Sequence, residues 1–342
     1  MLDLKYRPKS LDSIVGLSNV KLQLSGMVKM GNIPKRLLFY GPPGSGKTTV
    51  ARLLVKYVNC DNFLCGNCDS CKEKNHPDLF EVNFADHRGI DDMRELIKLA
   101  YYVPKYKHKV LVLDEIHQAT PQALQALLKP LEEPSKGTIW VLVSTDPNKL
   151  PDSIHSRCYK FEFSYPSREE CFSLLKRIAK REKIGLDDKI IYKIVDSVDR
   201  QPRQALLVME SVGGIVSGGG KVDEDTITKL VFGASLDYLE SIYNCDFKNS
   251  FSVVESSRTD VNSFLSGVYD THKKVLYSRI KLYKMNSDLV NLSKRIPINV
   301  MLDMLIEIGS YLESKNYSYN TLTNITARLL KKVYDCISME EN

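Results

Sequence analysis

The segment GPPGSGKT, from Gly41 to Thr48, has the residue types and spacing of a loop that binds nucleotide phosphates. Its glycines permit backbone conformations in which amide groups face an anion, and Lys47 can reach the β- and γ-phosphates. The hydroxyl of Thr48 is the expected magnesium ligand. The pattern therefore predicts binding of ATP with Mg²⁺. The expected nucleotide contacts from this part of the chain are Gly41, Pro42, Pro43, Gly44, Ser45, Gly46, Lys47, Thr48 and Thr49.

A second candidate element is the acidic pair that ends VLVLDE, residues 110–115. Its apolar run favours a buried strand, and open parallel sheets place their ligands at the carboxyl ends of strands. Asp114 is the expected second magnesium ligand, and Glu115 could polarise the attacking water as a general base. The letters DEIH also resemble a helicase signature, but a helicase needs a second motor domain, which the C-terminal half does not indicate.

Two further candidates follow the last predicted core strand. Thr145 closes the apolar run TIWVLVST, where it could hydrogen-bond the γ-phosphate or the attacking water. Arg157, in HSRC, has two interpretations. It pairs with a nearby acid, or it is an arginine finger that enters the nucleotide site of a neighbouring subunit, in which case ATP hydrolysis would depend on assembly.

A compact cluster of cysteines follows the phosphate loop, at Cys60, Cys65, Cys68 and Cys71. Two C-x-x-C steps share Cys68, and four thiolates in one short loop suit tetrahedral Zn²⁺. An iron–sulfur cluster and a redox dithiol are the alternatives. A loop of this size buries too little apolar area to hold itself, so we expect the metal to stiffen an inserted module at about 60–76 that displays a surface for a partner.

Composition narrows the class of protein. The 342 residues are 43% hydrophobic and 26% charged, which is typical of a globular chain with two or three domains. The formal net charge of +6 permits contact with a polyanion without demonstrating it. No run of about 18 apolar residues predicts a membrane span, and the first residues lack the apolar core of a signal peptide. We therefore expect a cytoplasmic protein with reduced thiols.

The elements that must position these residues alternate between strand and helix. Apolar runs at 36–41, 79–84, 109–115 and 138–145 predict buried parallel strands, with helical patterns between them. This order predicts an α/β fold, a parallel sheet flanked by helices, over residues 1–165.

Helical periodicity alone continues after this region. It predicts a small helical domain at 166–232 and an all-helical domain at 233–342, with the junction near FGAS, residues 232–235.

These motifs occur in an order that resembles AAA+ sliding-clamp loaders, and most closely the gamma/tau-type subunits of bacterial DNA polymerase III. The segments that carry the resemblance are KYRP (5–8), VG (15–16), GPPGSGKT, the four cysteines, DEIH, ALLKPLEEP (126–134), STDPNKLPDSIHSRC (144–158) and RQPRQALL (200–207). The resemblance is dense from about residue 4 to 210. It implies an ATPase domain, a helical lid and a helical collar that joins five subunits in a ring. It also implies a short form, without the long tau-type extension.

The resemblance assigns roles to single residues. Arg157 matches the finger that acts in trans, Arg203 matches the lid arginine that senses the γ-phosphate, and Thr145 matches the polar sensor on the fourth core strand. The N-terminal segment that packs around adenine is matched by Tyr6, Arg7 and Pro8. For primer–template DNA the candidate contacts are Arg88 and Lys129, although Pro130 directly after Lys129 disfavours a regular helix there.

The cysteine cluster departs from this pattern in one respect. The resemblance implies a zinc module at this position with a longer first gap, whereas four residues separate Cys60 from Cys65. The fourth ligand is therefore either Cys60 or nearby His76. The function implied is that of a clamp-loader ATPase, stimulated by DNA and by the clamp, in which ATP binding drives clamp opening and loading and hydrolysis releases the clamp. The alternative is a ring subunit that serves as a non-hydrolysing scaffold.

Overall fold

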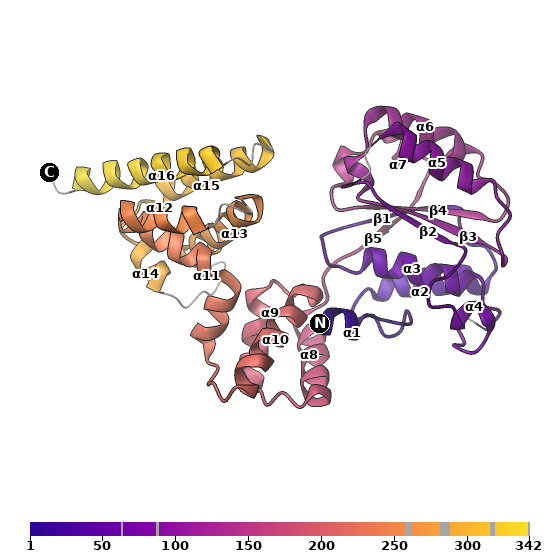
Figure 1. The fold of residues 1–342 in the computed structure, drawn as a ribbon, viewed down its shortest axis with the longest axis horizontal. Helices are drawn as coiled ribbons and strands as arrows, with labels where there is room; N and C mark the ends of the chain where they lie inside the picture. Colours follow the sequence, from indigo (N-terminus) through magenta and orange to yellow (C-terminus); the bar gives the residue numbers. More distant parts are fainter. Residues whose placement is uncertain (63, 87–88, 257–260, 281–287, 315–318, 341–342) are drawn as a thin grey trace. The chain divides into compact units, whose positions relative to one another are not determined.

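A computed structural model gives the fold of the chain (Figure 1). It describes residues 1–342 apart from 63, 87–88, 257–260, 281–287, 315–318 and 341–342. The chain divides into two compact units, Met1–Gly219 and Gly220–Asn342. The candidate residues for nucleotide and metal all belong to the first unit.

The first unit contains a parallel sheet of five strands in the order β2-β3-β4-β1-β5. The strands are β1 (Arg36–Tyr40), β2 (Leu79–Asn83), β3 (Lys109–Asp114), β4 (Thr138–Ser144) and β5 (Tyr159–Glu162). The predicted α/β class and its four strands are confirmed. The edge strand β5 was not predicted, because it has four residues of which only Phe161 is buried, too short a pattern to read from sequence.

Alternating side chains of the central strands supply two separate cores. On one face Phe39, Val112 and Val141 pack with helices α2 (Ser18–Lys29) and α3 (Lys47–Val58). On the other face Leu111, Trp140 and Leu142 pack with three further helices. Those helices are α5 (Ile90–Ala100), α6 (Pro121–Glu132) and α7 (Asp152–His155), and Figure 1 shows them covering the face opposite α2 and α3. All seven residues of β4 are buried, as expected for the middle of a doubly covered sheet.

Short elements complete this α/β region. They are α1 (Leu2–Lys5), α4 (Asp69–Lys72) and two 3-10 turns at Ile116–Gln118 and Pro147–Lys149. After β5 come α8 (Arg168–Glu182), α9 (Asp188–Ser197) and α10 (Pro202–Ser217), in the region where the sequence has helical periodicity. We call these three helices the three-helix region. Helix α1 packs against α10, so the N-terminus lies beside the three-helix region.

Every described secondary-structure element of the second unit is a helix. Its helices are α11 (Glu224–Tyr243), α12 (Phe247–Ser256), α13 (Val261–Arg279), α14 (Asp288–Ser293), α15 (Ile298–Ser314) and α16 (Tyr319–Glu340). Buried residues of these helices form one core, in which Tyr238 and Tyr243 are the largest fully buried side chains. Helix α11 runs without interruption across 232–233, while the two compact units divide at Gly219–Gly220. The boundaries of lid and collar stay predictions.

Candidate functional site

The phosphate loop joins the end of β1 to the start of α3, and glycine is required at two of its positions. Gly41 has a φ of 141°, and a Cβ atom there would lie 2.0 Å from the carbonyl oxygen of Phe163. Gly44 has a φ of 71°, and its Cβ would lie 2.7 Å from the side-chain nitrogen of Gln201. Only glycine combines positive φ with so close a neighbour. The loop is therefore shaped by the segment after β5 and by the three-helix region.

Lys47 lies at the first position of α3 with only 5% of its surface exposed. Its ammonium group donates hydrogen bonds of 2.7 Å to the carbonyl oxygens of Gly41 and Pro42. Burial lowers the pKa of Lys47, and the nearby carboxylates of Glu115 and Asp114 oppose that shift. A buried cation held by neutral carbonyl groups is well placed to gain energy from an anion that enters the loop.

Thr48 and Asp114 meet at the carboxyl end of β3. The hydroxyl of Thr48 donates a 2.7 Å hydrogen bond to Asp114 Oδ2, as expected for two ligands of one metal ion. Burial raises the pKa of Asp114, and the hydrogen bond from Thr48 opposes that rise. A hydroxyl and a carboxylate are hard oxygen donors of the kind that Mg²⁺ takes beside substrate phosphates. The residues present fit the predicted ion.

Glu115, the candidate base, follows Asp114 with a left-handed φ of 50°, a conformation uncommon outside glycine. Its carboxylate accepts a 2.8 Å hydrogen bond from the hydroxyl of Thr145 at the end of β4. The imidazole Nδ1 of His117 lies 3.3 Å from the same carboxylate and 3.3 Å from the hydroxyl of Ser144. Thr145 thus holds the Glu115 carboxylate from the neighbouring strand, and His117 is a contact that the sequence did not reveal.

Lys47, Thr48, Asp114 and Glu115 open onto a cleft of about 910 Å³ within the first unit, and Thr145 lies behind Glu115, outside the described lining. Of the predicted nucleotide contacts, Gly41 and Pro42 do not line the cleft. Those that do are Tyr6, Arg7, Pro8, Pro43, Gly44, Ser45, Gly46, Lys47, Thr48, Thr49 and Arg203, together with Asp114 and Glu115. The described lining also includes residues that were not predicted, among them Arg52, Asn83, Arg177 and Arg181. Arg177 and Arg181 are one turn apart on α8. Their spacing indicates a shared helix face but not what that face meets.

The N-terminal segment is tied to the three-helix region beside this cleft. The hydroxyl of Tyr6 and the ammonium group of Lys5 both donate hydrogen bonds to the carboxylate of Glu182, and these two bonds lower its pKa. On α10, Nε of Arg203 lies 3.6 Å from the buried carboxylate of Asp3. The guanidinium of Arg203 remains largely exposed toward the cleft, with 69% of its side chain accessible.

Arg157 lies outside the described lining of the cleft. Its guanidinium donates to the carboxylate of Glu132 at the end of α6 and, over 2.8 Å, to the carbonyl oxygen of Ser153. The side chain is 29% exposed. The local ion pair considered for this arginine is therefore present, and the arginine does not act on the nucleotide site of its own chain in this conformation.

The four cysteines converge as predicted. The sulfur atoms of Cys60, Cys65, Cys68 and Cys71 all lie within 4.8 Å of one another. Cys65 Sγ accepts hydrogen bonds from the backbone amides of Asn67 (3.4 Å) and Cys68 (3.3 Å), which lower the pKa of Cys65 to about 6. A thiolate stabilised by amide groups is the form that binds metal. The arrangement is compatible with a closed tetrahedral zinc site.

His76 is not part of this cluster. Its ring is buried, with Nε2 2.9 Å from the hydroxyl of Ser70 and Nδ1 accepting a 3.1 Å hydrogen bond from the amide of Asp78. Both ring nitrogens are thus engaged, and no lone pair is left for a metal. The geometry favours Cys60 as the fourth ligand, because Cys60 Sγ lies with the other three sulfurs.

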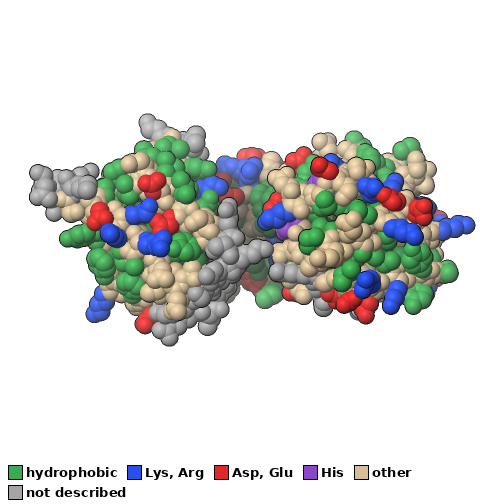
Figure 2. All heavy atoms as spheres, turned by 90° about the horizontal axis from the view of Figure 1, so that it is seen from above, with side chains coloured by type: hydrophobic (Ala, Val, Ile, Leu, Met, Phe, Trp, Pro, Cys, Tyr) green, Lys and Arg blue, Asp and Glu red, His purple; other side chains and the backbone are tan. Residues whose placement is uncertain are grey.

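Of the two residues predicted to contact DNA, the structure describes only Lys129. Arg88 lies outside the described residues. Lys129 lies on α6 and is exposed, and the helix continues through Pro130 to Glu132 and is not broken there. Lysine, arginine and acidic side chains are interspersed on the face of the molecule drawn in Figure 2, so the positive charge is not gathered into one patch on that face. DNA contact by Lys129 stays a prediction.

The sheet order, the phosphate loop and the acidic pair together define a P-loop ATPase fold of the AAA+ class. Solved structures agree: the RuvB Holliday junction branch migration motor of Thermotoga maritima superimposes with a TM-score of 0.54 at 21% identity, over 69% of this chain and 79% of that one. A variant of the same RuvB protein gives a TM-score of 0.54 at 20% identity with the same coverage of both chains. Identities at this level show the fold alone.

Sequence comparison identifies the family. Residues 16–167 match the family model of the DNA polymerase III delta subunit. The chain is 30% identical to the DNA polymerase III subunit gamma/tau of Mycoplasma genitalium, over 82% of this chain and 49% of the relative. It is 35% identical to the gamma/tau subunit of Mycobacterium bovis (74% and 46%) and 34% identical to the gamma subunit of Buchnera aphidicola (66% and 64%).

The chain belongs to the family of bacterial DNA polymerase III gamma/tau subunits. It spans about half the length of the two gamma/tau relatives. Among the described residues, no helix combines the length and apolar character needed to cross a bilayer.

Proposed function

We propose that this chain is an ATPase subunit of a sliding-clamp loader. One observation carries the proposal: in a chain of the gamma/tau family, the phosphate loop, the Thr48–Asp114 pair and Glu115 line one cleft, and Thr145 hydrogen-bonds Glu115. A scaffold that only bound nucleotide would need the loop but not a positioned base. The complete set therefore favours hydrolysis over the non-hydrolysing alternative.

The chain's own residues divide the work of hydrolysis. Lys47 and the loop amides bind the β- and γ-phosphates, while Thr48 and Asp114 would hold Mg²⁺, which neutralises phosphate charge when bound. Glu115, oriented by Thr145, takes the proton of the attacking water. Arg203 reaches the γ-phosphate from α10, which couples the nucleotide to the position of the lid. Tyr6, Arg7 and Pro8 form the wall for the base.

Hydrolysis would be completed between subunits. In the proposed assembly, Arg157 leaves Glu132 and meets the ATP of the next subunit in a pentameric ring, which the helices of residues 233–342 join. The sliding clamp and primer–template DNA are the proposed partners, with Arg88 and Lys129 as candidate DNA contacts. DNA binding would then stimulate hydrolysis and release of the clamp. Zinc at the four cysteines would have a structural role.

The experiment is ATP turnover and clamp loading by the full chain, assembled with the clamp-loader subunits, clamp and primed DNA of its own source. We expect turnover that rises when clamp and primed DNA are both present, and its loss in Lys47→Ala. Clamp loading that proceeds with ATP bound but without turnover by this subunit would instead establish the scaffold function.

A further inference from the structure

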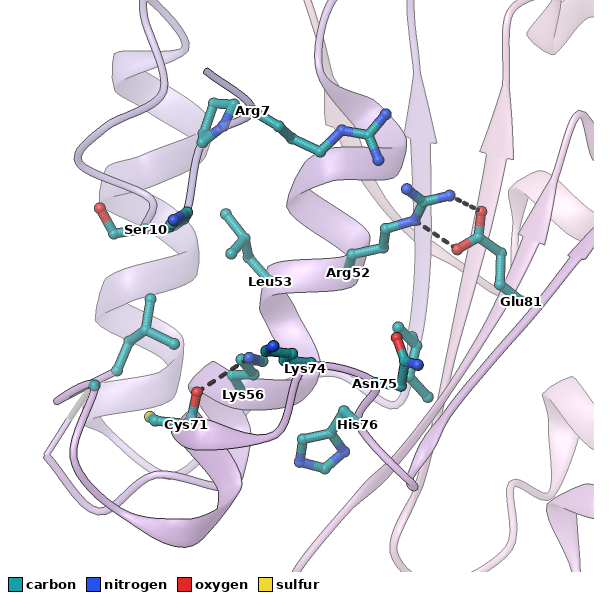
Figure 3. Close-up of a pocket in the computed structure, with 15 residues that line it drawn as sticks. Arg7, Ser10, Arg52, Leu53, Lys56, Cys71, Lys74, Asn75, His76 and Glu81 are labelled. Atoms are coloured by element: carbon teal, nitrogen blue, oxygen red, sulfur yellow. Dashed lines mark hydrogen bonds and ion pairs between the residues drawn. The ribbon is translucent and has the colours of Figure 1, made fainter. Parts of the chain in front are cut away.

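A second cleft of about 810 Å³ lies beside the cysteine cluster, and most of its described lining residues lie outside the proposed nucleotide site (Figure 3). We call it the basic groove. It lies between the N-terminal segment, helix α3, the loop that leaves α4, and strand β2. Its size is in the range of about 300–1,000 Å³ that is usual for ligand sites. The described lining residues include Arg7, Lys9, Arg52, Lys56 and Lys74.

Positive charge in the basic groove is poorly compensated. Glu81 is the single carboxylate among its described lining residues, and it is already held by Arg52 in two hydrogen bonds of 2.6 and 2.7 Å (Figure 3). Lys56 donates to the backbone carbonyl oxygens of Cys71 and Glu73, so neutral groups hold its charge. Lys9 and Lys74 are exposed and pair with no carboxylate of the described residues.

The floor of the basic groove is apolar. Leu53, Leu64 and Leu79 line it, and Figure 3 shows Leu53 between the segment that carries Ser10 and the loop that carries Lys74. None of the described lining residues is Phe, Tyr or Trp, the side chains on which nucleic-acid bases stack. A basic rim over an aliphatic floor is complementary to a ligand that carries both carboxylates and aliphatic side chains.

We propose that the basic groove is a docking site for an acidic peptide segment of a partner protein, with aliphatic side chains on Leu53 and Leu79 and carboxylates on Lys9 and Lys74. The cysteine cluster then has a definite role. It fixes the chain around Cys71, three residues before Lys74, and Lys56 ties that chain to the same helix that carries Lys47 and Thr48.

The docking site adjoins the nucleotide cleft. The segment from Arg7 to Ser10 and the side chain of Arg52 line both. A peptide seated in the basic groove therefore contacts the other side of the wall that faces the nucleotide. In the experiment, an ATP analogue must therefore occupy the nucleotide cleft, so that peptides can bind in the basic groove but not in that cleft.

The experiment selects a random peptide library displayed on phage against the immobilised, zinc-loaded full chain, with a non-hydrolysable ATP analogue in solution. Affinity of the most enriched peptide is then measured by fluorescence anisotropy for wild type, Lys9→Glu, Lys74→Glu and the matched control Lys72→Glu. Lys72 lies on α4 but does not line the basic groove. We expect enriched peptides rich in Asp or Glu with Leu or Ile. Each groove variant should weaken binding about fivefold or more, and the control less than about twofold.

Three results would overturn the proposal. One is that no peptide is enriched on wild type relative to a Lys9→Glu/Lys74→Glu double variant. Another is that enriched peptides lack acidic residues, or bind the groove variants and the control equally. The third is that labelled single-stranded DNA binds wild type more tightly than the enriched peptide does and loses that affinity in the double variant, which would make nucleic acid the occupant. ATP affinity of Lys74→Glu, expected to equal that of wild type, reports that the variant is folded.

Discussion

Arg157 donates its guanidinium hydrogen bonds to Glu132 of its own chain and lies away from the cleft that its own chain offers to nucleotide. The two side chains are 29% and 49% exposed, and an ion pair so accessible contributes about 0–1 kcal/mol to stability. Release of Arg157 from Glu132 is therefore an inexpensive step. This fits the proposal that Arg157 is free to contact the nucleotide of a neighbouring subunit.

Thr145 should matter for the chemical step and not for nucleotide binding. Thr145→Val removes the hydroxyl that donates a 2.8 Å hydrogen bond to Glu115, so the carboxylate keeps only its longer contact with His117 while the phosphate loop is untouched. We expect kcat for ATP to fall about 10- to 100-fold with KM changed less than about threefold. Thr145→Ser keeps the donor and should retain most activity. Full turnover by the valine variant would show that Glu115 does not depend on this contact.

Zinc content should separate Cys60 from His76. Wild type is expected to hold about one zinc ion per chain by elemental analysis. Cys60→Ser removes one of the four clustered sulfurs and should lose most of that zinc, whereas His76→Asn should keep it because both ring nitrogens are already hydrogen-bonded. Retained zinc in Cys60→Ser together with lost zinc in His76→Asn would reverse the assignment.

His272 predicts an acid sensitivity of the second unit. The ring is fully buried, its Nδ1 lies 2.5 Å from the hydroxyl of Tyr243, and its Nε2 lies 2.8 Å from the carbonyl oxygen of Met301. Burial lowers the pKa of His272 to about 4 from an ordinary value of 6.5. As pH falls below 6.5, His272 becomes protonated in the unfolded chain but stays neutral in the folded chain. Stability present at pH 7 should therefore decline toward pH 4, by at most about 3 kcal/mol.

The measurement is thermal unfolding of wild type and His272→Asn between neutral and acidic pH. The variant should be less stable at neutral pH, since it loses buried hydrogen bonds, but its melting temperature should fall less as pH drops. Equal slopes for the two proteins would mean that His272 is not the group that links the stability of this unit to protons.

Much of the fold and of the candidate site could be predicted, because in those segments the local residue pattern and the observed structure agree. The apolar runs of β1, β3 and β4 are buried on both faces and leave little choice of structure. The phosphate loop is specified by its own glycines, and the cysteines by their spacing. In each of these cases the residues that determine the structure lie close together in the sequence.

What could not be predicted depends on contacts between distant segments. Strand β5 is an edge strand fixed by its pairing with β1, not by its own pattern. Arg177 and Arg181 face the cleft because of how α8 packs, and His117 reaches Glu115 through a turn after β3. The engagement of His76 by Ser70 and Asp78 likewise follows from folding of the module. No residue pattern in one segment reports such relationships.

The most direct test of the central claim, that Arg157 completes hydrolysis in a neighbouring subunit, is a mixing experiment. Arg157→Ala chains are combined with Lys47→Ala chains in otherwise normal assemblies, and DNA-stimulated ATP turnover is measured against the mixing ratio. Each variant alone should be nearly inactive. Mixtures should recover activity, because a chain with intact Lys47 can receive Arg157 from a neighbour that lacks its own phosphate-loop lysine. Full activity of assemblies that contain Arg157→Ala chains and no Lys47→Ala chains would contradict the account.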